Sequence, residues 1–438
     1  MLYSTEVHNQ ICKYAESDSF AKDYLNYFKQ IEVKCNELSS ETIPALFHPV
    51  ILPRDTLSKI SHQCEQMNEI LNKTTNLYKN NSDVKAYFNL PDPLDEWVNI
   101  NPGYNIQIPI SRYDGFWDGK TCRFCEFNTD GTSGMDEVST LDEIFLNTKM
   151  GKYLDNLYSL KNFDLRLSTL ETLIAAYKNF GGKKTPNIAI ADFLDLATLP
   201  EFKALKKYFT DKGYPTEICD IRHLKYKNGS LFHNDFKIDL IYRRAVTDDM
   251  FPRKDDIKEF LEAYKKNAVC VVGPLCSHIA HTKIVLTFLS SPLAENLFND
   301  QEITFIRNHV PWTRLLTDDS TLISDIISNK DDYFLKPHNS NSGKGVHAGE
   351  EFDTESFKKE IDLILKNKNQ TYIVQRKIPI PTDYFISENS GTLKEYKVNI
   401  SSYVFNNKLC GFFTRVSSGS VINTDRGALV VPMFTFEQ

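Results

Sequence analysis

The chain has 438 residues, which is enough for about three domains or for one large domain with additions. Hydrophobic residues make up 41% and charged residues 25%, a composition that argues against a collagen-like, disordered or membrane-spanning chain. The 51 Lys and Arg residues and 58 Asp and Glu residues give a net charge of −7, whereas a nucleic-acid-binding protein is more often basic.

The first ten residues are polar and lack the basic and apolar regions of a signal peptide. No apolar run reaches the length of about 18 residues that a membrane-spanning helix needs, so we expect no membrane partner. The nine cysteines are scattered, which favours reduced thiols over a disulfide framework. We therefore predict a cytoplasmic protein that has no nucleic-acid partner.

Helical patterns dominate the first hundred residues. Between Asp55 and Tyr78, apolar residues recur at helical spacings, which predicts a helix with Asp55 as its N-cap. Residues 89–109 contain Pro91, Pro93 and Pro102, and we expect a linking loop there. These patterns predict an N-terminal helical region over residues 1–100.

The middle of the chain alternates between strand and helix patterns, which is typical of an α/β unit with βαβ character. Strands are predicted at 187–193, 216–221, 238–242 and 268–272, and helices at 199–212, 254–266 and 276–289. A hairpin is predicted at 225–233, with its turn at Asn228-Gly229.

The last third mixes both elements, as in an α+β unit. Helices are predicted at 322–327 and 354–365, and strands at 333–337, 372–380, 395–405 and 408–416. Clefts commonly form between domains, so we expect an active site there.

The most informative motif is a predicted hairpin with polar side chains on one face. Arg112 and Asp114 lie two apart on one strand, Glu126 and Asn128 lie two apart on the next, and 118–120 reads as the turn. Two carboxylates and an amide oxygen are the hard ligands that Mg²⁺ takes, and an adjacent Arg can neutralise a phosphoryl group. Spacing alone leaves a solvated surface hairpin equally open.

A second motif ends the strand at 333–337. Lys336 is followed by a loop of Asn, Ser and Gly residues, so an ammonium group and backbone N–H groups can bind phosphate there. The motif is not a Walker A loop, because His338 and Gly345 stand where that pattern requires Gly and Ser or Thr. A simple Gly-rich turn is the alternative interpretation.

Three arginines also stand at strand ends. Arg415 is followed by small and polar residues, which suits delivery of a charge into a cleft, although a surface arginine is the alternative. Arg243 and Arg244 end a strand of the α/β unit, where open sheets bind ligands. One of them could hold an anionic group, or both could form structural ion pairs.

Two pairs of metal-ligand residues carry weaker signals. Cys122-x-x-Cys125 has no second such pair, which argues against a zinc or redox role. His278-x-x-His281 lacks the glutamate of a metalloprotease helix and is predicted to lie on a helix surface.

Taken together, the motifs resemble a known family. The run R-x-D followed by E-x-N is similar to the metal-binding segment of circularly permuted ATP-grasp proteins, the glutathionylspermidine synthetase-like group. The resemblance continues in the family's order through residues 220–244, 310–315, 333–346, 372–378 and 411–416. It implies an α/β and α+β circularly permuted ATP-grasp fold, with a Rossmann-like pre-ATP-grasp unit and the metal-binding hairpin in 101–282 and a nucleotide-binding unit in 283–438.

The resemblance also implies roles for residues that match the family's motifs. Asp114, Glu126 and Asn128 would bind Mg²⁺, and Arg112 and Arg415 would stabilise the transferring phosphoryl group. The implied nucleotide-binding residues are Lys283, Lys336, the loop residues Ser342, Gly343, Lys344 and Gly345, and the segment beside adenine, Gln375, Arg376 and Lys377.

The implied activity is an ATP-dependent ligation of a carboxylate and an amine through an acyl phosphate, with ATP and two Mg²⁺ ions. The expected partners are a small-molecule or peptide carboxylate and an amine, either of which a carrier protein could present. The chain shows no amidase domain, so we do not assign to it the substrate of the enzyme that gives the family its name. A non-catalytic nucleotide-binding module, a phosphotransferase acting on a small polyol or sugar, and a purely structural α/β protein remain alternatives.

Overall fold

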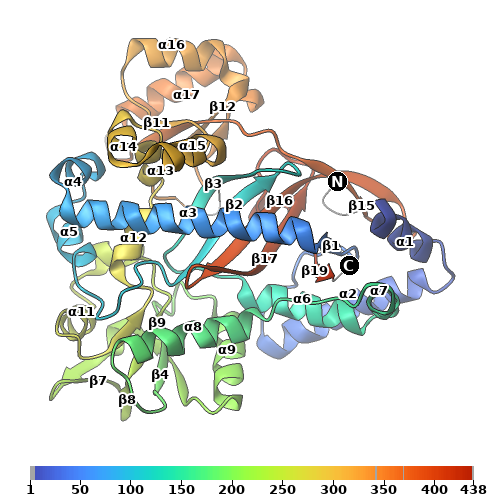
Figure 1. The fold of residues 1–438 in the computed structure, drawn as a ribbon, viewed down its shortest axis with the longest axis horizontal. Coiled ribbons are helices and arrows are strands. Elements are labelled where there is room, and N and C mark those ends of the chain that lie inside the picture. Colours follow the sequence, from blue (N-terminus) through green and yellow to red (C-terminus); the bar gives the residue numbers. More distant parts are fainter. Residues whose placement is uncertain (1–4, 341–342, 368, 437–438) are drawn as a thin grey trace.

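The computed structural model describes residues 5–340, 343–367 and 369–436, and Figure 1 shows their arrangement. The N-terminal part is helical, as the sequence predicts. Its helices are α1 (Thr5–Ala15), α2 (Phe20–Leu38), α3 (Arg54–Asn80), α4 (Ser82–Phe88) and α5 (Asp92–Val98). Strand β1 (Val50–Pro53) pairs in parallel with β19 (Met433–Phe436), which ties this region to the other end of the chain.

Two local predictions in this region are wrong. Helix α3 begins at Arg54 with Pro53 as its N-cap, so Asp55 lies in the first turn, where its charge still favours the helix dipole. Helix α5 lies within the stretch predicted as a loop. Pro93 stands in its first turn, where a missing N–H group removes no helical hydrogen bond, so the proline is compatible with a helix.

A central antiparallel sheet joins segments from both halves of the chain. Its strand order is β18-β17-β16-β2-β3, and β15 also pairs with β16. The strands are β2 (Ile110–Trp117), β3 (Cys122–Asn128), β15 (Thr382–Ile386), β16 (Leu393–Phe405), β17 (Lys408–Ser417) and β18 (Leu429–Val430). Helix α3 runs across this sheet in Figure 1 and contacts β16 and β17. Because β2 pairs directly with β16, the predicted polar hairpin lies beside the C-terminal strands.

The predicted α/β unit forms a four-stranded parallel sheet with the order β10-β9-β4-β5. Its strands are β4 (Ile188–Asp192), β5 (Thr216–Asp220), β9 (Leu240–Arg243) and β10 (Cys270–Val272). The same stretch of the chain forms the helices α6 (Met135–Asn147), α7 (Lys149–Tyr158), α8 (Leu165–Asn179), α9 (Leu199–Asp211), α10 (Thr247–Met250) and α11 (Lys258–Lys265), of which α8 and α9 contact the strands of this sheet. The βαβ interpretation is confirmed, because every strand pair in this sheet is parallel.

The predicted hairpin beside this sheet is also confirmed. Strands β6 (Lys225–Lys227) and β7 (Ser230–His233) are joined by Asn228 and Gly229, with φ values of 52° and 73°. Two successive positive φ values are what a tight hairpin turn with the correct twist requires. Strand β8 (Phe236–Ile238) adds the third strand of this small sheet.

The helix predicted over 276–289 is interrupted. The structure has α12 (His278–His281) and α13 (Ile284–Leu289), with Thr282 and Lys283 between them. The backbone N–H of Lys283 donates to the carbonyl of His338 at 2.9 Å instead of continuing one helix. The continuous apolar pattern concealed this break, which brings Lys283 next to the loop that follows Lys336. Helices α14 (Pro292–Leu297) and α15 (Asp300–His309) come next.

A third sheet, at the top of Figure 1, has the order β11-β14-β12-β13. Its strands are β11 (Thr313–Leu315), β12 (Tyr333–Pro337), β13 (His347–Ala348) and β14 (Tyr372–Arg376), and its helices are α16 (Ser320–Ser328) and α17 (Thr354–Lys366). Leu335, Phe357 and Val374 belong to a hydrophobic core of its own, separate from the main core, which extends from Val7 to Phe436. The domain boundaries at 100 and 282 stay predictions.

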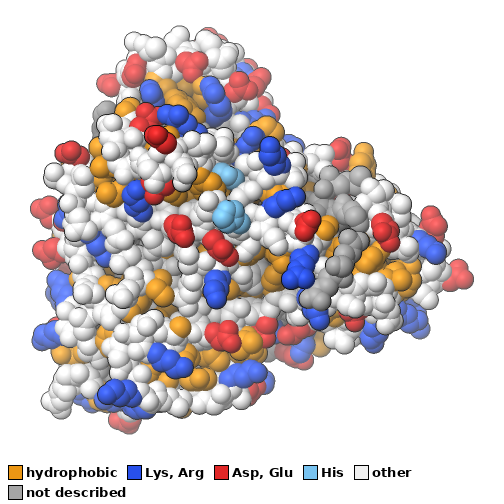
Figure 2. All heavy atoms as spheres, in the orientation of Figure 1, with side chains coloured by type: hydrophobic (Ala, Val, Ile, Leu, Met, Phe, Trp, Pro, Cys, Tyr) orange, Lys and Arg blue, Asp and Glu red, His pale blue; other side chains and the backbone are white. Residues whose placement is uncertain are grey.

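Short 3₁₀ helices complete the chain, at Ile221–His223, Phe251–Arg253, Leu275–Ser277, Lys330–Asp332, Gly349–Glu351 and Thr424–Arg426. No helix in the described part of the chain is long and apolar enough to cross a membrane. On the face that Figure 2 shows, basic and acidic side chains are interspersed, and neither sign gathers into one large patch.

Candidate active site

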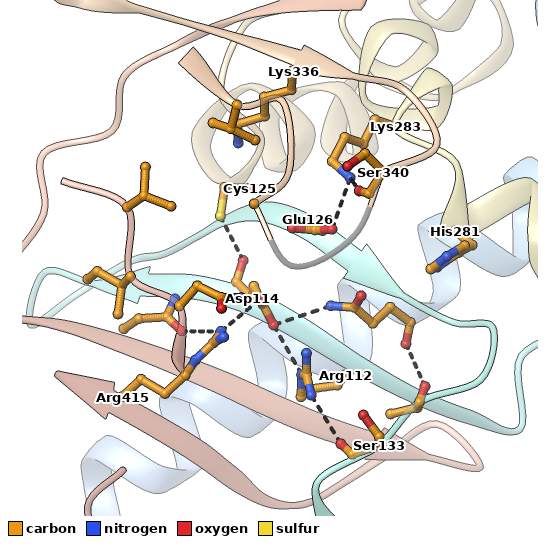
Figure 3. Close-up of a pocket in the computed structure, with 18 of the residues that line it drawn as sticks. Arg112, Asp114, Cys125, Glu126, Ser133, His281, Lys283, Lys336, Ser340 and Arg415 are labelled. Atoms are coloured by element: carbon orange, nitrogen blue, oxygen red, sulfur yellow. Dashed lines mark hydrogen bonds and ion pairs between the residues drawn. The ribbon is translucent and has the colours of Figure 1, made fainter. Parts of the chain in front are cut away.

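A cavity of about 420 Å³ is lined by residues from all three large sheets. Its walls come from β2, β3 and β17 of the central sheet, from β12 and β14 of the third sheet, and from the segments that follow β4 and β9. In Figure 3, Arg112, Asp114 and Arg415 lie on the lower side of the view, and Lys283 and Lys336 lie on the upper side. Charged side chains that are far apart in the sequence therefore face one space.

The predicted hairpin is confirmed, and its polar side chains lie side by side. Strands β2 and β3 pair Arg112 with Asn128 and Asp114 with Glu126. Residues two apart in a strand share a face, and all four of these side chains line the cavity. The register shifts directly after Asp114, and such bulges are common beside active sites.

Asp114 lies at the centre of a network of donors. Its Oδ2 accepts from Arg415 Nη2 at 2.7 Å, and its Oδ1 accepts from Arg112 Nε at 3.2 Å and Asn128 Nδ2 at 3.4 Å. Burial alone would raise the pKa of Asp114, but the two guanidinium groups outweigh burial and lower the pKa to about 2. Asp114 is therefore a fixed negative charge at neutral pH.

Arg415 is held in place by the neighbouring strand β16. Its Nη2 also donates to Asn399 Oδ1 at 2.8 Å and Ser401 Oγ at 3.0 Å. Arg415 is only 4% exposed, so it is not the surface arginine that the alternative interpretation describes. The guanidinium groups of both Arg415 and Arg112 lie 5.3 Å from the centre of the Phe413 ring, which fixes the two cations on one side of the cavity.

Glu126 faces a lysine from the helix interruption. Lys283 Nζ lies 3.0 Å from Glu126 Oε1 and donates to the carbonyl of Ser340 at 2.6 Å. Burial opposes ionisation of Glu126, but the ammonium group of Lys283 prevails and holds the pKa of that carboxyl below its ordinary value. Lys283 thus connects the hairpin that carries Glu126 with the loop that follows Lys336. Figure 3 shows its contacts with both Glu126 and Ser340.

Lys336 projects from β12 beside a buried amide. Its Nζ donates to Gln375 Oε1 at 2.6 Å, and Gln375 Nε2 donates to Thr313 Oγ1 at 3.2 Å. Gln375 is 2% exposed and pairs with Phe334 in the register of β12 and β14. Gln375 also lines the cavity, so its contact with Lys336 stands beside the position next to adenine that the resemblance implies, which stays a prediction.

The same part of the cavity has apolar walls. Phe334 and Val346 line it from the third sheet and its loop, and Ile378 and Ile380 line it from the segment after β14. Arg376 and Gly343, which the resemblance singled out, also line the cavity. An apolar slot next to Lys336 has the chemistry that a planar base requires.

Some predicted nucleotide-binding residues lie elsewhere. Lys344, Gly345 and Lys377 are not among the residues that line the cavity, and Lys377 forms an ion pair with Glu350 instead. Ser342 lies outside the described residues.

The two weaker motifs have clear positions. Cys122 is buried, and Cys125 lines the cavity with its thiol 3.4 Å from the carbonyl of Asp114. The prediction of a helix surface for the histidines is wrong, because His278 and His281 are 2% and 8% exposed. All four residues of the short helix α12 are buried, so both imidazole rings lie inside the protein and not on its surface.

The two arginines after β9 both form buried ion pairs. Arg243 Nη2 lies 2.5 Å from Asp130 Oδ1, and Arg244 Nη1 lies 3.1 Å from Glu201 Oε2. Glu201 also accepts from the backbone N–H groups of Gly134 and Met135 at the start of α6. Both arginines therefore form the structural ion pairs that the sequence analysis gave as the alternative to anion binding. Arg244 also lines the cavity.

The hairpin has the donor chemistry that Mg²⁺ requires. Within residues 5–340, 343–367 and 369–436, no group of three or more His, Cys, Asp or Glu side chains is arranged to hold a metal ion. Mg²⁺ does not need such a group, because it is commonly held by one or two carboxylates with water and phosphate oxygens. Asp114 and Glu126, paired across two strands with Asn128 beside them, provide those oxygens.

Several residues that line the cavity or hold its side chains were not identified from the sequence. Asn399 and Ser401 share a face of β16, and their two-residue spacing is a signal that could have identified them once β16 was placed beside β2. Asp192 stands directly at the end of β4, the position where parallel sheets bind ligands. Asp249 lies on the short helix α10 and Ser133 on a connecting loop, and neither element gives a comparable pattern.

No family model matches this chain, and no curated protein matches it. Among solved structures, the chain is similar to a glutathione synthetase-like effector from Globodera pallida, with a TM-score of 0.61 and 12% identity over 96% of this chain and 99% of that one. A weaker similarity, with a TM-score of 0.43 and 11% identity, covers 82% of this chain and 83% of a candidate gamma-glutamylcysteine synthetase from Methylobacillus flagellatus. The first similarity shows that this chain has a glutathione synthetase-like fold.

Proposed function

We propose that this protein is an ATP-dependent ligase that joins a carboxylate to an amine. The observation that carries the proposal is the charge arrangement at the hairpin, where Arg112, Arg415 and Lys283 contact the Asp114 and Glu126 carboxylates. Lys336 adds a further cation to the same cavity. Such a site neutralises the charge of a transferring phosphoryl group, and the fold is shared with a glutathione synthetase-like protein.

Each part of the cavity has a role in this proposal. Asp114, Glu126 and Asn128 would hold Mg²⁺, which would neutralise negative charge on the phosphates of the nucleotide. Lys283 and Lys336 bind the phosphates, and the backbone at Gly343 covers them. The slot at Phe334 and its apolar neighbours holds the base. The circularly permuted topology and the glutathionylspermidine synthetase-like grouping are part of the same proposal.

The reaction has two steps. A carboxylate oxygen attacks the γ-phosphorus of ATP, and the bond between that phosphorus and the β,γ-bridging oxygen breaks. ADP is the leaving group, and the carboxylate becomes an acyl phosphate. The amine nitrogen then attacks the acyl carbon, inorganic phosphate leaves, and the amine releases a proton. Arg112 and Arg415 face the charge that develops during transfer, and their fixed positions mean that no reorganisation is needed at that moment.

The proposed substrates are a small-molecule or peptide carboxylate and an amine, and a carrier protein is a possible source of either. The expected compartment is the cytoplasm. ATP is the proposed phosphoryl donor, with two Mg²⁺ ions.

Hydroxylamine allows a test that does not require the natural amine. It attacks acyl phosphates and gives stable hydroxamates, so pools of amino acids, dicarboxylic acids and short peptides are incubated with ATP, Mg²⁺ and hydroxylamine. We expect a hydroxamate of one acid class together with an equal amount of ADP. Glu126→Gln should abolish both products, while Glu295→Gln, a surface glutamate paired with Arg307, should not.

The other outcomes separate the alternatives. A stable phosphorylated product without hydroxamate would identify a phosphotransferase. ATP binding with no ADP release from any pool would identify a non-catalytic nucleotide-binding module. Either result would contradict the ligase proposal.

A further inference from the structure

Buried polar atoms without partners gather at one end of the cavity. Among the described residues, no hydrogen-bond partner exists for Arg244 Nε, Thr247 Oγ1, Asp248 Oδ2 or His281 Nδ1. Of these residues, Arg244 and His281 line the cavity and are 3% and 8% exposed. Buried polar atoms are normally satisfied, so this concentration indicates a site whose partner is a bound molecule.

This end of the cavity coincides with a feature of the parallel sheet. From β4, the chain passes through α9 to β5 on one side, and β9 then pairs on the other side of β4. The strand order therefore reverses between β4 and β9. Asp192 ends β4, Arg244 directly follows β9, and both line the cavity. Open α/β sheets bind ligands at such a point, outside the carboxyl ends of the strands.

The charges there are unbalanced. Arg243 pairs with Asp130, and Arg244 pairs with Glu201. Asp192 and Asp249, which line the cavity, have no Lys or Arg partner in the described part of the chain. The adjacent Asp248 lies with its Oδ1 4.0 Å from Nε2 of the His278 imidazole. The carboxylates therefore outnumber the cations that neutralise them.

We propose that Asp192 and Asp249 bind an ammonium group of the amine substrate, in the subsite that Arg244 and His281 complete. This inference rests on the proposed ligase function, and it assigns the amine half of that reaction to the end of the cavity away from Lys336. Three N–H donors of one ammonium group match the carboxylate oxygens and the free ring nitrogen. Arg244 Nε adds a donor for an oxygen of the same molecule.

Other groups support a cation as the occupant. Burial lowers the pKa of His281, which keeps its ring neutral and able to accept a hydrogen bond. Partial burial raises the pKa of Asp192 to about 6. Asp249 is exposed at the cavity, and its pKa is raised by the desolvation that remains there and by the neighbouring Asp248. A bound positive charge would favour the ionised form of both carboxylates and so lower both pKa values again. Leu196, which is 50% exposed, lines the cavity and offers an apolar surface for the substrate's carbon chain.

Three small probes of matched size test the charge preference. Glycinamide is cationic, glycine is zwitterionic and glycolate is anionic at neutral pH, and each is titrated while thermal unfolding is followed. We expect glycinamide to raise the melting temperature most and glycolate to have no effect. Asp192→Asn and Asp249→Asn should weaken glycinamide binding roughly tenfold, the effect of losing one charge-assisted hydrogen bond.

Matched controls separate this inference from the ligase proposal. Asp255→Asn, at an exposed carboxylate paired with Lys258, should leave glycinamide binding unchanged. The shift with Mg²⁺ and ATP is measured for every variant, and its retention shows that the variant is folded. Stabilisation by glycolate equal to that by glycinamide, or glycinamide binding that both variants retain, would overturn the ammonium subsite. Glycinamide binding without any ATP shift would instead overturn the proposed ligase function alone.

Discussion

Arg415 Nη2 lies 2.7 Å from Asp114 Oδ2, although the two residues are 301 positions apart in the sequence. The contact forms because β17 and β2 both pair with β16, which brings the C-terminal cation to the N-terminal carboxylate. Both side chains are buried, so each compensates the charge of the other. The contact links the fold to the chemistry of the cavity.

Removing Arg415 should therefore destabilise the protein. In Arg415→Ala, Asp114 loses one of its two guanidinium partners, and breaking a buried pair in this way costs about 3 kcal/mol of unfolding free energy. Urea unfolding of the variant and the wild type at pH 7 measures the difference. The double variant Arg415→Ala with Asp114→Asn should recover part of that loss, and no recovery would contradict the proposed coupling.

The contact between Lys336 and Gln375 predicts a specific pattern of nucleotide binding. Gln375→Leu removes the acceptor of the lysine, so affinity for ATP and for GTP should both fall roughly tenfold. A residue that contacted adenine would affect ATP more than GTP. Calorimetric titration of both nucleotides distinguishes the two roles, and a selective loss of ATP affinity would favour the placement beside adenine.

The raised pKa of Asp192 predicts a pH-dependent stability. Burial raises this pKa from 3.8 to about 6, while Arg244 and Arg243 oppose the shift and Asp249 adds to it. The folded state then binds the proton more tightly than the unfolded chain, so this group's contribution to stability falls as pH rises from about 4 to 6.

Asp192→Asn removes that contribution. The stability of the variant relative to the wild type should rise by about 2 kcal/mol across this pH range. Urea unfolding at pH 4.5 and pH 7 provides the comparison, with Asp255→Asn as an exposed control whose relative stability stays nearly constant. A flat difference for the Asp192 variant would contradict the burial argument.

Local sequence signals predicted the hairpin well. The turn at 118–120 and the alternation of Arg112, Asp114, Glu126 and Asn128 depend only on neighbouring residues, and the structure shows the same strands and faces. The parallel sheet was also predictable, because its strands and helices alternate regularly. These features need no knowledge of which distant segments meet.

Features that depend on distant contacts were not predictable. The interruption before Lys283 depends on a backbone hydrogen bond to His338, which the local apolar pattern cannot reveal. Gln375 and Lys336 meet only because β12 and β14 pair antiparallel. The inward turn of His278 and His281 likewise follows from what packs around α12.

The central claim is that the cavity binds Mg²⁺ and ATP through the hairpin, and thermal unfolding tests it most directly. ATP at about 100 times its dissociation constant should stabilise the wild type by roughly 2.7 kcal/mol when Mg²⁺ is present. The shift should shrink when EDTA replaces Mg²⁺ and in Glu126→Gln, but not in Glu295→Gln. No shift at millimolar ATP, or an equal shift in Glu126→Gln, would contradict the claim and leave the hairpin without a nucleotide-binding role.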